Sequence, residues 1–400
     1  MLKGKHILLG VTGSIAAYKA LEIISLLKKQ RAEIKVIMTD SATKFVTPLS
    51  FSSLTNNPVA CDMFEAPIKW DIEHISLAKW ADIAVVAPAT ANIIGKLAMG
   101  IADDMLSTVL MATKAPIMIA PAMNTAMFDN VATQTNIKTL KERGILFIEP
   151  AKGVLACGDS GKGKLEDPKV ILDAIISEIA FEKDLEGMKL LVTAGATMES
   201  IDPVRFITNH SSGKMGISIA KAAKYRGADV TLIHGSISVE RPINIKCIEA
   251  KSANEMYLAC AENFPNNDIL IKSAAVADFR PVEYAENKIK KTNKMTVELT
   301  KNIDILSELS SSKRDNQFVV GFCMETKDLI ENATSKLNAK KLDMIVANNL
   351  FDKNAGFATD NNTVTIIDKE GHLDSLPNMD KFLVANKILD KLLSIYSKKN

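Results

Sequence analysis

The chain has 400 residues, with 49 Lys and Arg against 47 Asp and Glu, so its formal net charge at pH 7 is only +2. This balance excludes a protein whose overall field draws it to nucleic acid or to an anionic membrane, although a small anionic substrate needs only local charge. The length suits two or three domains of about 100–200 residues each, and two α/β domains are the natural expectation.

Other bulk features narrow the class further. The five cysteines are odd in number and widely spaced without a CxxC pair, which argues against a disulfide framework and a structural zinc site. No apolar run reaches the roughly 18 residues of a membrane span, and the chain starts with a strand-like run instead of a signal peptide. We therefore expect a cytoplasmic protein with small-molecule substrates and with no nucleic-acid or membrane partner.

The first half alternates short apolar runs with helix-like segments. Ser14 is placed to cap the helix after the first run, and the runs span residues 6–11, 33–38, 83–87, 117–120 and 145–148. This alternation predicts a parallel sheet with helices on both faces. Ligands of such sheets lie beyond the carboxyl ends of the strands. Here those ends carry polar or glycine-containing segments at 13–15, 39–41, 88–92 and 121–124.

A glycine-rich segment and a charged segment close the first half. Residues 149–164 hold four glycines and no regular apolar period, so they are predicted to form a mobile loop that clamps a pocket. Pro168 is predicted to start a helix that runs to about residue 182, and the charged residues 182–187 are the favoured boundary. The predicted domains are therefore 1–187 and 188–400.

The second half repeats the alternation. Strands are predicted at 188–193, 229–233, 269–273, 318–321, 344–347 and 364–367, and helices near 213–226, 252–263, 303–310, 328–341 and 380–395. Between the first strand and the first helix, Gly213 and Gly216 permit tight turning and close backbone approach. Residues 202–216 are therefore predicted to form a phosphate loop at a helix start, although the spacing matches neither the P-loop nor the GxGxxG pattern.

Six motifs in this order resemble the bifunctional phosphopantothenoylcysteine decarboxylases and phosphopantothenate-cysteine ligases of bacterial coenzyme A synthesis. They are His74, PAMNTAM at 121–127, LACG at 155–158, the 202–216 segment, AAVAD at 274–278 and KIKK at 288–291. The resemblance covers nearly the whole chain. It implies two doubly wound α/β domains, a flavodoxin-like FMN-dependent decarboxylase domain at 1–187 and a Rossmann-like CTP-dependent ligase domain at 188–400.

By this resemblance, FMN lies at the strand ends of the first domain, and the substrate thiol is oxidised to a thioaldehyde before the carboxylate is lost. A flavin is needed because no ordinary side chain accepts a hydride. His74 is the implied base, Asn124 holds the substrate carboxylate, and Cys157 donates the final proton. An imidazole and a thiol suit these roles because both exchange protons. The implied FMN contacts are Gly13, Ser14, Ile15, Thr39, Thr90 and Ser107.

In the second domain, the resemblance implies that the carboxylate of 4′-phosphopantothenate attacks the α-phosphate of CTP, after which the cysteine amine displaces CMP. Asn209 would steady the acyl-cytidylate, and Lys288 would assist its formation because fixed positive charge stabilises developing negative charge. Mg²⁺ or Mn²⁺ is expected without an assigned protein ligand, because substrate phosphates commonly hold such ions. The implied CTP contacts are Ala274, Asp278, Lys288, Asn302, Asp304, Phe322, Lys336 and Lys340.

The resemblance also implies a homo-oligomer, for which a dodecamer is one suggested form. The chain departs from the usual family pattern at Ala196, Phe128 and Ile303, where Gly, Trp and Pro are usual, and at Cys323-Met324, where smaller residues are usual. Two alternatives stay open. The flavin half could act on another substrate, such as a peptide cysteine or a prenyl donor, or the chain could sense nucleotides without turnover.

Overall fold

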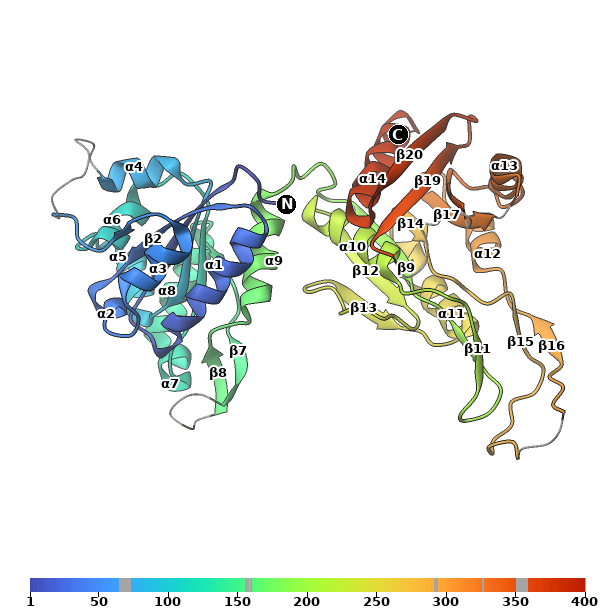
Figure 1. Ribbon diagram of the computed structural model, residues 1–400, viewed down its shortest axis with the longest axis horizontal. Coiled ribbons are helices and arrows are strands. Elements are labelled where there is room, and N and C mark those ends of the chain that lie inside the picture. The colour runs from blue at the N-terminus through green and yellow to red at the C-terminus, as the bar shows by residue number, and fades with distance from the viewer. Residues whose placement is uncertain are drawn as a thin grey trace. The chain divides into compact units, whose positions relative to one another are not determined.

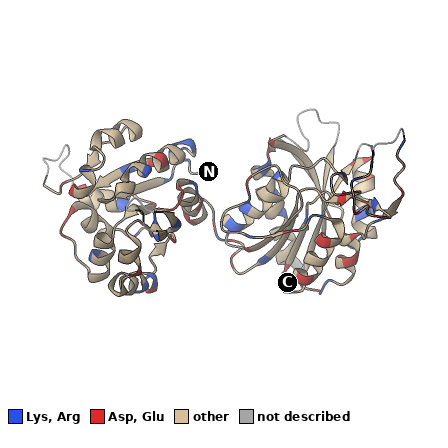
Figure 2. Cartoon of the chain, turned by 90° about the horizontal axis from the view of Figure 1, so that it is seen from below, with Lys and Arg blue, Asp and Glu red and all other residues tan. Residues whose placement is uncertain are grey.

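The structure is a computed structural model that describes residues 1–64, 73–154, 158, 160–290, 294–325, 327–349 and 359–399. The chain separates into two compact units, Met1–Phe181 and Glu182–Asn400 (Figure 1). Charged residues of both signs occur in each unit (Figure 2). Within the described ranges, no helix combines the length and the apolar character needed to cross a membrane.

The first unit is built on a six-stranded parallel sheet in the order β3-β2-β1-β4-β5-β6. Apart from the two-residue edge strand β3, this is the 2-1-3-4-5 order of flavodoxin-like sheets, with the change of direction between β1 and β4. The apolar runs therefore form the predicted parallel sheet. The strands are β1 (His6–Val11), β2 (Glu33–Met38), β3 (Val59–Ala60), β4 (Ile83–Ala89), β5 (Ile117–Pro121) and β6 (Leu146–Phe147).

Helices cover both faces of this sheet (Figure 1). One face carries α1 (Lys19–Lys29), α3 (Pro48–Thr55) and α9 (Pro168–Ile179), with α1 packed against the other two. The opposite face carries α4 (Glu73–Trp80), α5 (Ala91–Met99), α6 (Met105–Ala112) and α8 (Val131–Glu142), whose apolar side chains share one core with the sheet. The short elements η1 (Ile15–Tyr18), α2 (Asp40–Thr43) and α7 (Thr125–Asp129) follow strand ends.

The prediction for residues 149–164 was wrong in one respect. The described part of this segment is not an irregular loop but an antiparallel hairpin of β7 (Ala151–Val154) and β8 (Ser160–Lys164). A backbone bond from Met123 N to Gly163 O of 2.9 Å ties the hairpin to the end of β5. Gly163 permits this approach, because a Cβ atom there would lie 2.4 Å from the carbonyl oxygen of Met123.

The second unit is built on an eight-stranded sheet in the order β13-β12-β9-β14-β17-β18-β19-β20. The first six strands are parallel in the 3-2-1-4-5-6 order of Rossmann folds, while β19 and β20 add antiparallel pairs at the edge. The predicted mostly parallel sheet is confirmed. The strands are β9 (Lys189–Ala194), β12 (Asp229–His234), β13 (Lys246–Glu249), β14 (Ile269–Lys272), β17 (Phe318–Glu325), β18 (Met344–Asn349), β19 (Asn361–Asp368) and β20 (Leu373–Asp380).

Two apolar cores sandwich this sheet. One lies beneath α10 (Lys214–Tyr225) and α14 (Lys381–Lys399), and the other beneath α11 (Ala253–Asn263), α12 (Ile305–Ser311) and α13 (Leu329–Ala339). The 3-10 turn η2 (Phe264–Asn266) follows α11. Two small antiparallel pairs lie outside the main sheet, β10 (Met198–Ser200) with β11 (Phe206–Thr208), and β15 (Phe279–Pro281) with β16 (Leu299–Lys301).

Candidate active sites

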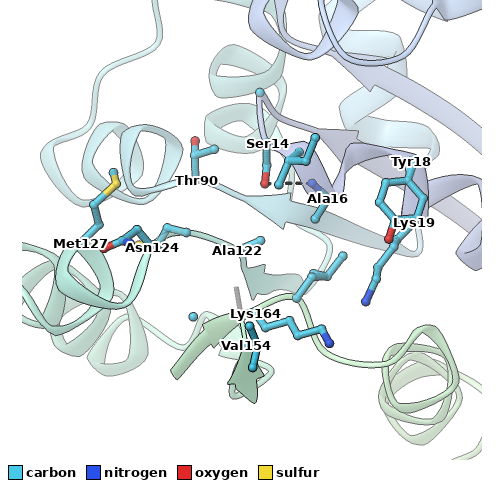
Figure 3. Close-up of a pocket in the computed structure, with 15 residues that line it drawn as sticks. Ser14, Ala16, Tyr18, Lys19, Thr90, Ala122, Asn124, Met127, Val154 and Lys164 are labelled. Carbon is cyan, nitrogen blue, oxygen red and sulfur yellow. Dashed lines mark hydrogen bonds between the residues drawn. The ribbon is translucent and has the colours of Figure 1, made fainter. Parts of the chain in front are cut away.

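The first unit has a cavity of about 420 Å³ at the carboxyl edge of its sheet, where the strand order reverses. Four of the predicted FMN contacts, Gly13, Ser14, Ile15 and Thr90, line it together with Asn124. Figure 3 shows Ser14 and Thr90 above the cavity, with Val154 and Lys164 entering from the β7–β8 hairpin. The structure therefore gathers residues from three strand ends and from the glycine-rich hairpin around one space.

The loops after β1 and β4 are held together by Thr12, a buried residue that sequence reasoning missed. Its hydroxyl donates to Pro88 O at 2.8 Å and accepts from Thr90 N at 3.1 Å. Ser14 Oγ accepts from Ala16 N at 3.2 Å, so the predicted cap is present. A Cβ atom at Gly13 would lie 2.4 Å from the Cβ atom of Ser41, so only glycine allows this loop to approach the one after β2.

Asn124 is oriented by the helix that follows it. Its Oδ1 accepts from Ala126 N at 2.8 Å and caps α7. The Asn124 side chain lines the cavity, and its amide nitrogen is a hydrogen-bond donor (Figure 3). A donor in this place suits the predicted contact with a substrate carboxylate.

Other residues predicted for the first site lie elsewhere. Thr39 caps α2 through Ala42 N and lines a neighbouring cavity of about 410 Å³ beyond β2. Ser107 is fully buried, and its hydroxyl and amide bond to Asp104 in the capping box that starts α6. His74 is half-buried on α4, outside the lining described for the 420 Å³ cavity. Cys157 lies outside the described residues.

The second unit has a larger cavity of about 610 Å³, also at the carboxyl edge of its sheet. The strand order reverses between β9 and β14, and the loops after these strands form much of the wall. Phe322 and the predicted phosphate loop from Asn209 to Gly216 are part of this wall. The other predicted residues in the lining are Ala274, Asp278, Lys336 and Lys340.

The phosphate loop ends at an open helix start. Gly213 has a φ of 77°, α10 begins after it without a side-chain cap, and the first three residues of α10 line the cavity. A Cβ atom at Gly216 would lie 2.7 Å from the carbonyl oxygen of Thr193, which explains why helix and strand can approach so closely here. Asn209 Nδ2 donates to Val276 O at 3.1 Å and connects the loop to the AAVAD motif.

Two predicted CTP contacts support the wall instead of lining it. Asn302 bonds to the backbone around Asp278, with Nδ2 to Ala277 O at 2.9 Å and its amide to Asp278 O at 2.8 Å. Asp304 caps α12 and pairs with Lys340 at 2.7 Å. Burial opposes the ionisation of Asp304, but the bonds from Lys340 and Ser307 outweigh it and lower its pKa.

The cavity also holds cations that the motifs did not reveal. Lys272 and Lys381 line it beside Lys214, which belongs to the 202–216 motif, and beside the predicted Lys336 and Lys340. Burial, with the neighbouring charge of Lys340, lowers the pKa of Lys272 to about 8. A cavity lined by several lysines and an open helix start is suited to a polyphosphate. No local signal could have placed Lys272 here, because it is the last residue of an apolar strand.

Lys288 lies outside the described lining of this cavity and is exposed to solvent. Its loop is nevertheless anchored, since Ile289 N donates to Asp202 Oδ2 at 3.1 Å. Arg205 Nη1 donates to Ile289 O at 3.1 Å and to Asp202 Oδ2 at 2.6 Å. The described part of the KIKK motif, residues 288–290, is thus held to the 202–216 segment at its base.

Buried threonines also shape the second site. Thr193 Oγ1 accepts from Ala274 N at 3.1 Å, and Thr197 Oγ1 accepts from Ala277 N at 3.0 Å. Ala196, between them, is 2% exposed and bonds through its backbone to Ser236, outside the described lining. The side chain at this position, where the resemblance leads one to expect glycine, therefore lies outside the described lining of the 610 Å³ cavity. Cys323 does line the cavity, but burial raises its pKa to about 11.

Each half of the chain matches a known protein family. Residues 1–180 match the Flavoprotein family, and residues 185–396 match the DNA/pantothenate metabolism flavoprotein C-terminal domain. The chain is 47% identical over 399 residues to the coenzyme A biosynthesis bifunctional protein CoaBC of Bacillus subtilis, with 99% of this chain and 98% of that protein covered. The chain belongs to the family of coenzyme A biosynthesis bifunctional proteins.

The chain is also similar to other curated proteins and to solved structures. The Haemophilus influenzae protein is 44% identical, with 99% of each chain covered, and the Escherichia coli K12 protein is 40% identical, with 100% of this chain and 99% of that protein covered. A solved C-terminal domain of CoaBC is 38% identical over 54% of this chain and 98% of that chain, with a TM-score of 0.47. A PPC decarboxylase variant complexed with pantothenoylaminoethenethiol is 34% identical over 43% and 96%, with a TM-score of 0.39.

Family membership confirms the main sequence-based prediction. The chain is a bifunctional enzyme of coenzyme A biosynthesis with decarboxylase and ligase activities. Its amino-terminal half is a flavoprotein domain.

Proposed function

We propose that the second unit joins 4′-phosphopantothenate to cysteine with CTP, and that the first unit decarboxylates the product with FMN. One observation carries this proposal. Each unit has a cavity at the point where its strand order reverses, and most of the residues predicted from the matching half line that cavity. Such points are where doubly wound sheets bind nucleotide-like ligands.

The lining of the first cavity fits a flavin mononucleotide. Ser14 and Thr90 begin helical segments, where backbone amides favour a phosphate, while Ile15, Met123 and Met127 provide apolar walls for a flat ring. A bound flavin would supply the hydride acceptor that side chains lack. Asn124 would hold the carboxylate of the substrate through its NH₂ end. His74 would accept the proton from the thiol, and Cys157 would return one to the product.

The lining of the second cavity fits a nucleoside triphosphate and a reaction through an acyl-cytidylate. The 4′-phosphopantothenate carboxylate oxygen would attack the α-phosphorus of CTP and expel pyrophosphate, after which the cysteine amine would attack the acyl carbon and release CMP. Asn209 would orient the acyl-cytidylate, and Lys336, Lys340 and Lys288 would offset negative charge. Asp278 and Phe322 would contact the nucleotide.

A divalent cation belongs to this proposal as a companion of the triphosphate. Among residues with a described position, no three His, Cys, Asp or Glu side chains gather as a metal site. We therefore assign Mg²⁺, or Mn²⁺, to the substrate phosphates, which commonly hold such ions with few protein ligands. Lysines in the cavity and the open start of α10 would share the remaining charge.

We also propose a cytoplasmic homo-oligomer, with a dodecamer as the form to test. Exposed apolar side chains support assembly, with Ile15 at 62% and Tyr18 at 59% on the rim of the first cavity. Val204, Phe206 and Tyr284, near the two small antiparallel pairs, are also more than half exposed. His74 and Lys288 lie outside the described linings within one chain, and a neighbouring subunit could bring them to a cavity. Light scattering on the active, flavin-loaded protein tests this proposal, and an active monomer would contradict it.

The division of labour is tested by two variants assayed for both reactions. His74→Asn should lower decarboxylation by about 10²–10⁴-fold, the range for loss of a proton-transfer group, and should leave ligation unchanged. Lys288→Gln should do the reverse, with a loss of about 10²–10³-fold in ligation, as for removal of a charge-stabilising donor. Carbon dioxide release reports the first reaction, and pyrophosphate and CMP report the second. If either change abolished both activities in folded protein, the assignment of the halves would be wrong.

A further inference from the structure

Lys272 holds an unusual place in the second cavity. It is the last residue of β14, a strand at the centre of the sheet, so its side chain leaves a fixed backbone and lines the cavity where the strand order reverses. Its Nζ donates to Ala274 O at 3.1 Å, which holds the ammonium group next to the AAVAD loop. The position of the charge is therefore set by the core of the fold and not by a surface loop.

Neighbouring lysines of the same cavity already have carboxylate partners. Lys214 pairs with Asp360 at 2.7 Å, Lys336 with Glu325 at 2.6 Å, and Lys340 with Asp304 at 2.7 Å. Lys272 has no carboxylate within ion-pair distance in the described part of the chain. Among the residues that the structure describes, this half-buried ammonium group has one hydrogen bond, to a carbonyl, so it keeps donors for a ligand and has no carboxylate in direct contact.

We propose that Lys272 binds the phosphates of the nucleotide in this cavity and takes up a proton when they arrive. The inference rests on the proposed function for the identity of the ligand. It goes beyond the six family motifs, which do not include this residue. The ligand class follows from the chemistry of the lining. Both the lysines and the uncapped start of α10 favour a ligand with several negative charges.

The surroundings of Lys272 explain why a proton would move. Burial and the positive charge of Lys340 lower its pKa to about 8, against weaker opposing effects from Asp304, Cys260 and Asp278. An anion in contact with the ammonium group favours the charged form and raises the pKa again. Above pH 8, the free enzyme therefore has a largely neutral lysine that becomes protonated in the complex.

One other lysine of the lining, Lys381, also has a pKa lowered by burial and by the charge of Lys214, so the Lys272 variants decide which lysine takes up the proton. Burial raises the pKa of Cys260 to about 12 and that of Cys323 to about 11, so neither thiol titrates between pH 7 and 9.5. The last ionisation of a phosphate group, near pH 6, is also complete below this range. His210 and Lys336 also line the cavity. Both residues are unchanged in the Lys272 variants, so they cannot account for a difference between those variants and the wild type.

The test measures CTP binding to the full-length protein with Mg²⁺, without the other substrates, from pH 7 to 9.5. Calorimetry in two buffers with different ionisation enthalpies gives the number of protons taken up. With a pKa of about 8, the free side chain is about three-quarters neutral at pH 8.5, so the wild type should take up nearly that fraction of a proton. Its Kd should rise toward tenfold per pH unit above pH 8.

Two substitutions separate charge from structure. Lys272→Arg keeps a permanent charge, so it should bind CTP but show no proton uptake above pH 8. Lys272→Met should weaken CTP binding at pH 7 by about 10- to 100-fold, the range for a lost hydrogen bond to a charged group, and should also show no uptake. Lys246→Met, at the exposed first residue of the edge strand β13, is the matched control and should behave as the wild type.

Pyrophosphate as a second probe assigns the contact to the phosphates. Lys272→Met should lose affinity for pyrophosphate as well as for CTP, while thermal unfolding shows that the variant is folded. The inference is overturned if the wild type takes up no proton, if Lys272→Arg takes up as much as the wild type, or if only CTP binding is weakened. Absence of wild-type binding to both probes would also overturn it. All of these measurements report binding. A failure of the proposed ligase reaction would instead appear in the assay for pyrophosphate and CMP release.

Discussion

At the scale of single residues, Asp202 shows how one carboxylate connects two motifs. Its side chain is fully enclosed, and its two oxygens accept bonds from the backbone amides of Val204, Arg205 and Ile289 and from the Arg205 guanidinium. Burial opposes ionisation, but these four donors outweigh it and hold the pKa of Asp202 at about 2. The charged carboxylate therefore fixes the base of the loop that carries Lys288.

Replacing Asp202 with Asn should release this loop. The substitution keeps the shape but places an NH₂ group opposite backbone donors, so the Ile289 amide should exchange with solvent faster. Ligation should fall while decarboxylation is unchanged, and hydrogen exchange with paired activity assays measures both. Asp229→Asn, at the exposed start of β12, is the control. Equal ligation in the two variants would show that the anchor has no role.

The same carboxylate predicts a pH dependence with a definite sign. A depressed pKa stabilises the fold fully above the unfolded value of about 4, and the contribution is lost as pH falls through about 2. The gap in unfolding midpoint between wild type and Asp202→Asn should therefore shrink from pH 4 to pH 2.

At the scale of elements, the contact between β9 and α10 positions the phosphate loop. Gly216 lies in the first turn of α10, and a Cβ atom there would be 2.6 Å from the Cβ atom of Ala194 and 2.7 Å from the carbonyl oxygen of Thr193. Neither atom can yield without moving the strand. The distance between helix and strand is thus set by the absence of a side chain.

Gly216→Ala should push α10 away from β9. We expect a loss of about 1–3 kcal/mol in the free energy of unfolding of the second unit, the usual cost of overpacking, together with weaker CTP binding. Gly95→Ala is a matched control within helix α5, because the nearest atom to its added Cβ is Asn136 Nδ2 at 3.6 Å. It should instead stabilise the first unit by about 0.5–1 kcal/mol. Urea unfolding measures both, and a stabilised Gly216→Ala protein would refute the packing argument.

At the scale of the whole molecule, each unit has its own apolar core. The core around β1, β4 and β5 belongs to the first unit, and the two cores on either side of the second sheet belong to the second unit. A sheet that buries both faces within one unit does not need the other unit to exclude water. The two activities can therefore share a chain without sharing a core.

Separate expression of residues 1–181 and 182–400 tests this independence. Each half should unfold cooperatively, the first should retain a yellow flavin, and the second should bind CTP. Circular dichroism, flavin absorbance and calorimetry provide the measurements. If either half were unfolded alone, its core would have to depend on the rest of the chain.

Local sequence patterns determined much of this protein. Apolar runs of four to six residues between helical periods predicted most of the parallel strands, because a buried strand needs apolar side chains on both faces. Ser14 and the 202–216 segment marked helix starts at strand ends, and the structure places them on the two cavities. These signals are local, so they can be recognised without knowledge of the fold.

Tertiary structure alone decided which residues meet. The β7–β8 hairpin depends on a bond to Met123, and the role of Lys272 depends on β14 lying between β9 and β17, contacts between segments distant in sequence. Thr12, Thr193 and Thr197 likewise bond to residues far away in the sequence, namely Pro88, Ala274 and Ala277. His74 and Lys288 show the converse, because their motifs were recognisable but one chain does not bring them into the described linings. The sequence by itself determined most strands of the two main sheets and the family. Strand pairing decided which residues share a site, because only pairing brings distant residues to one edge of a sheet.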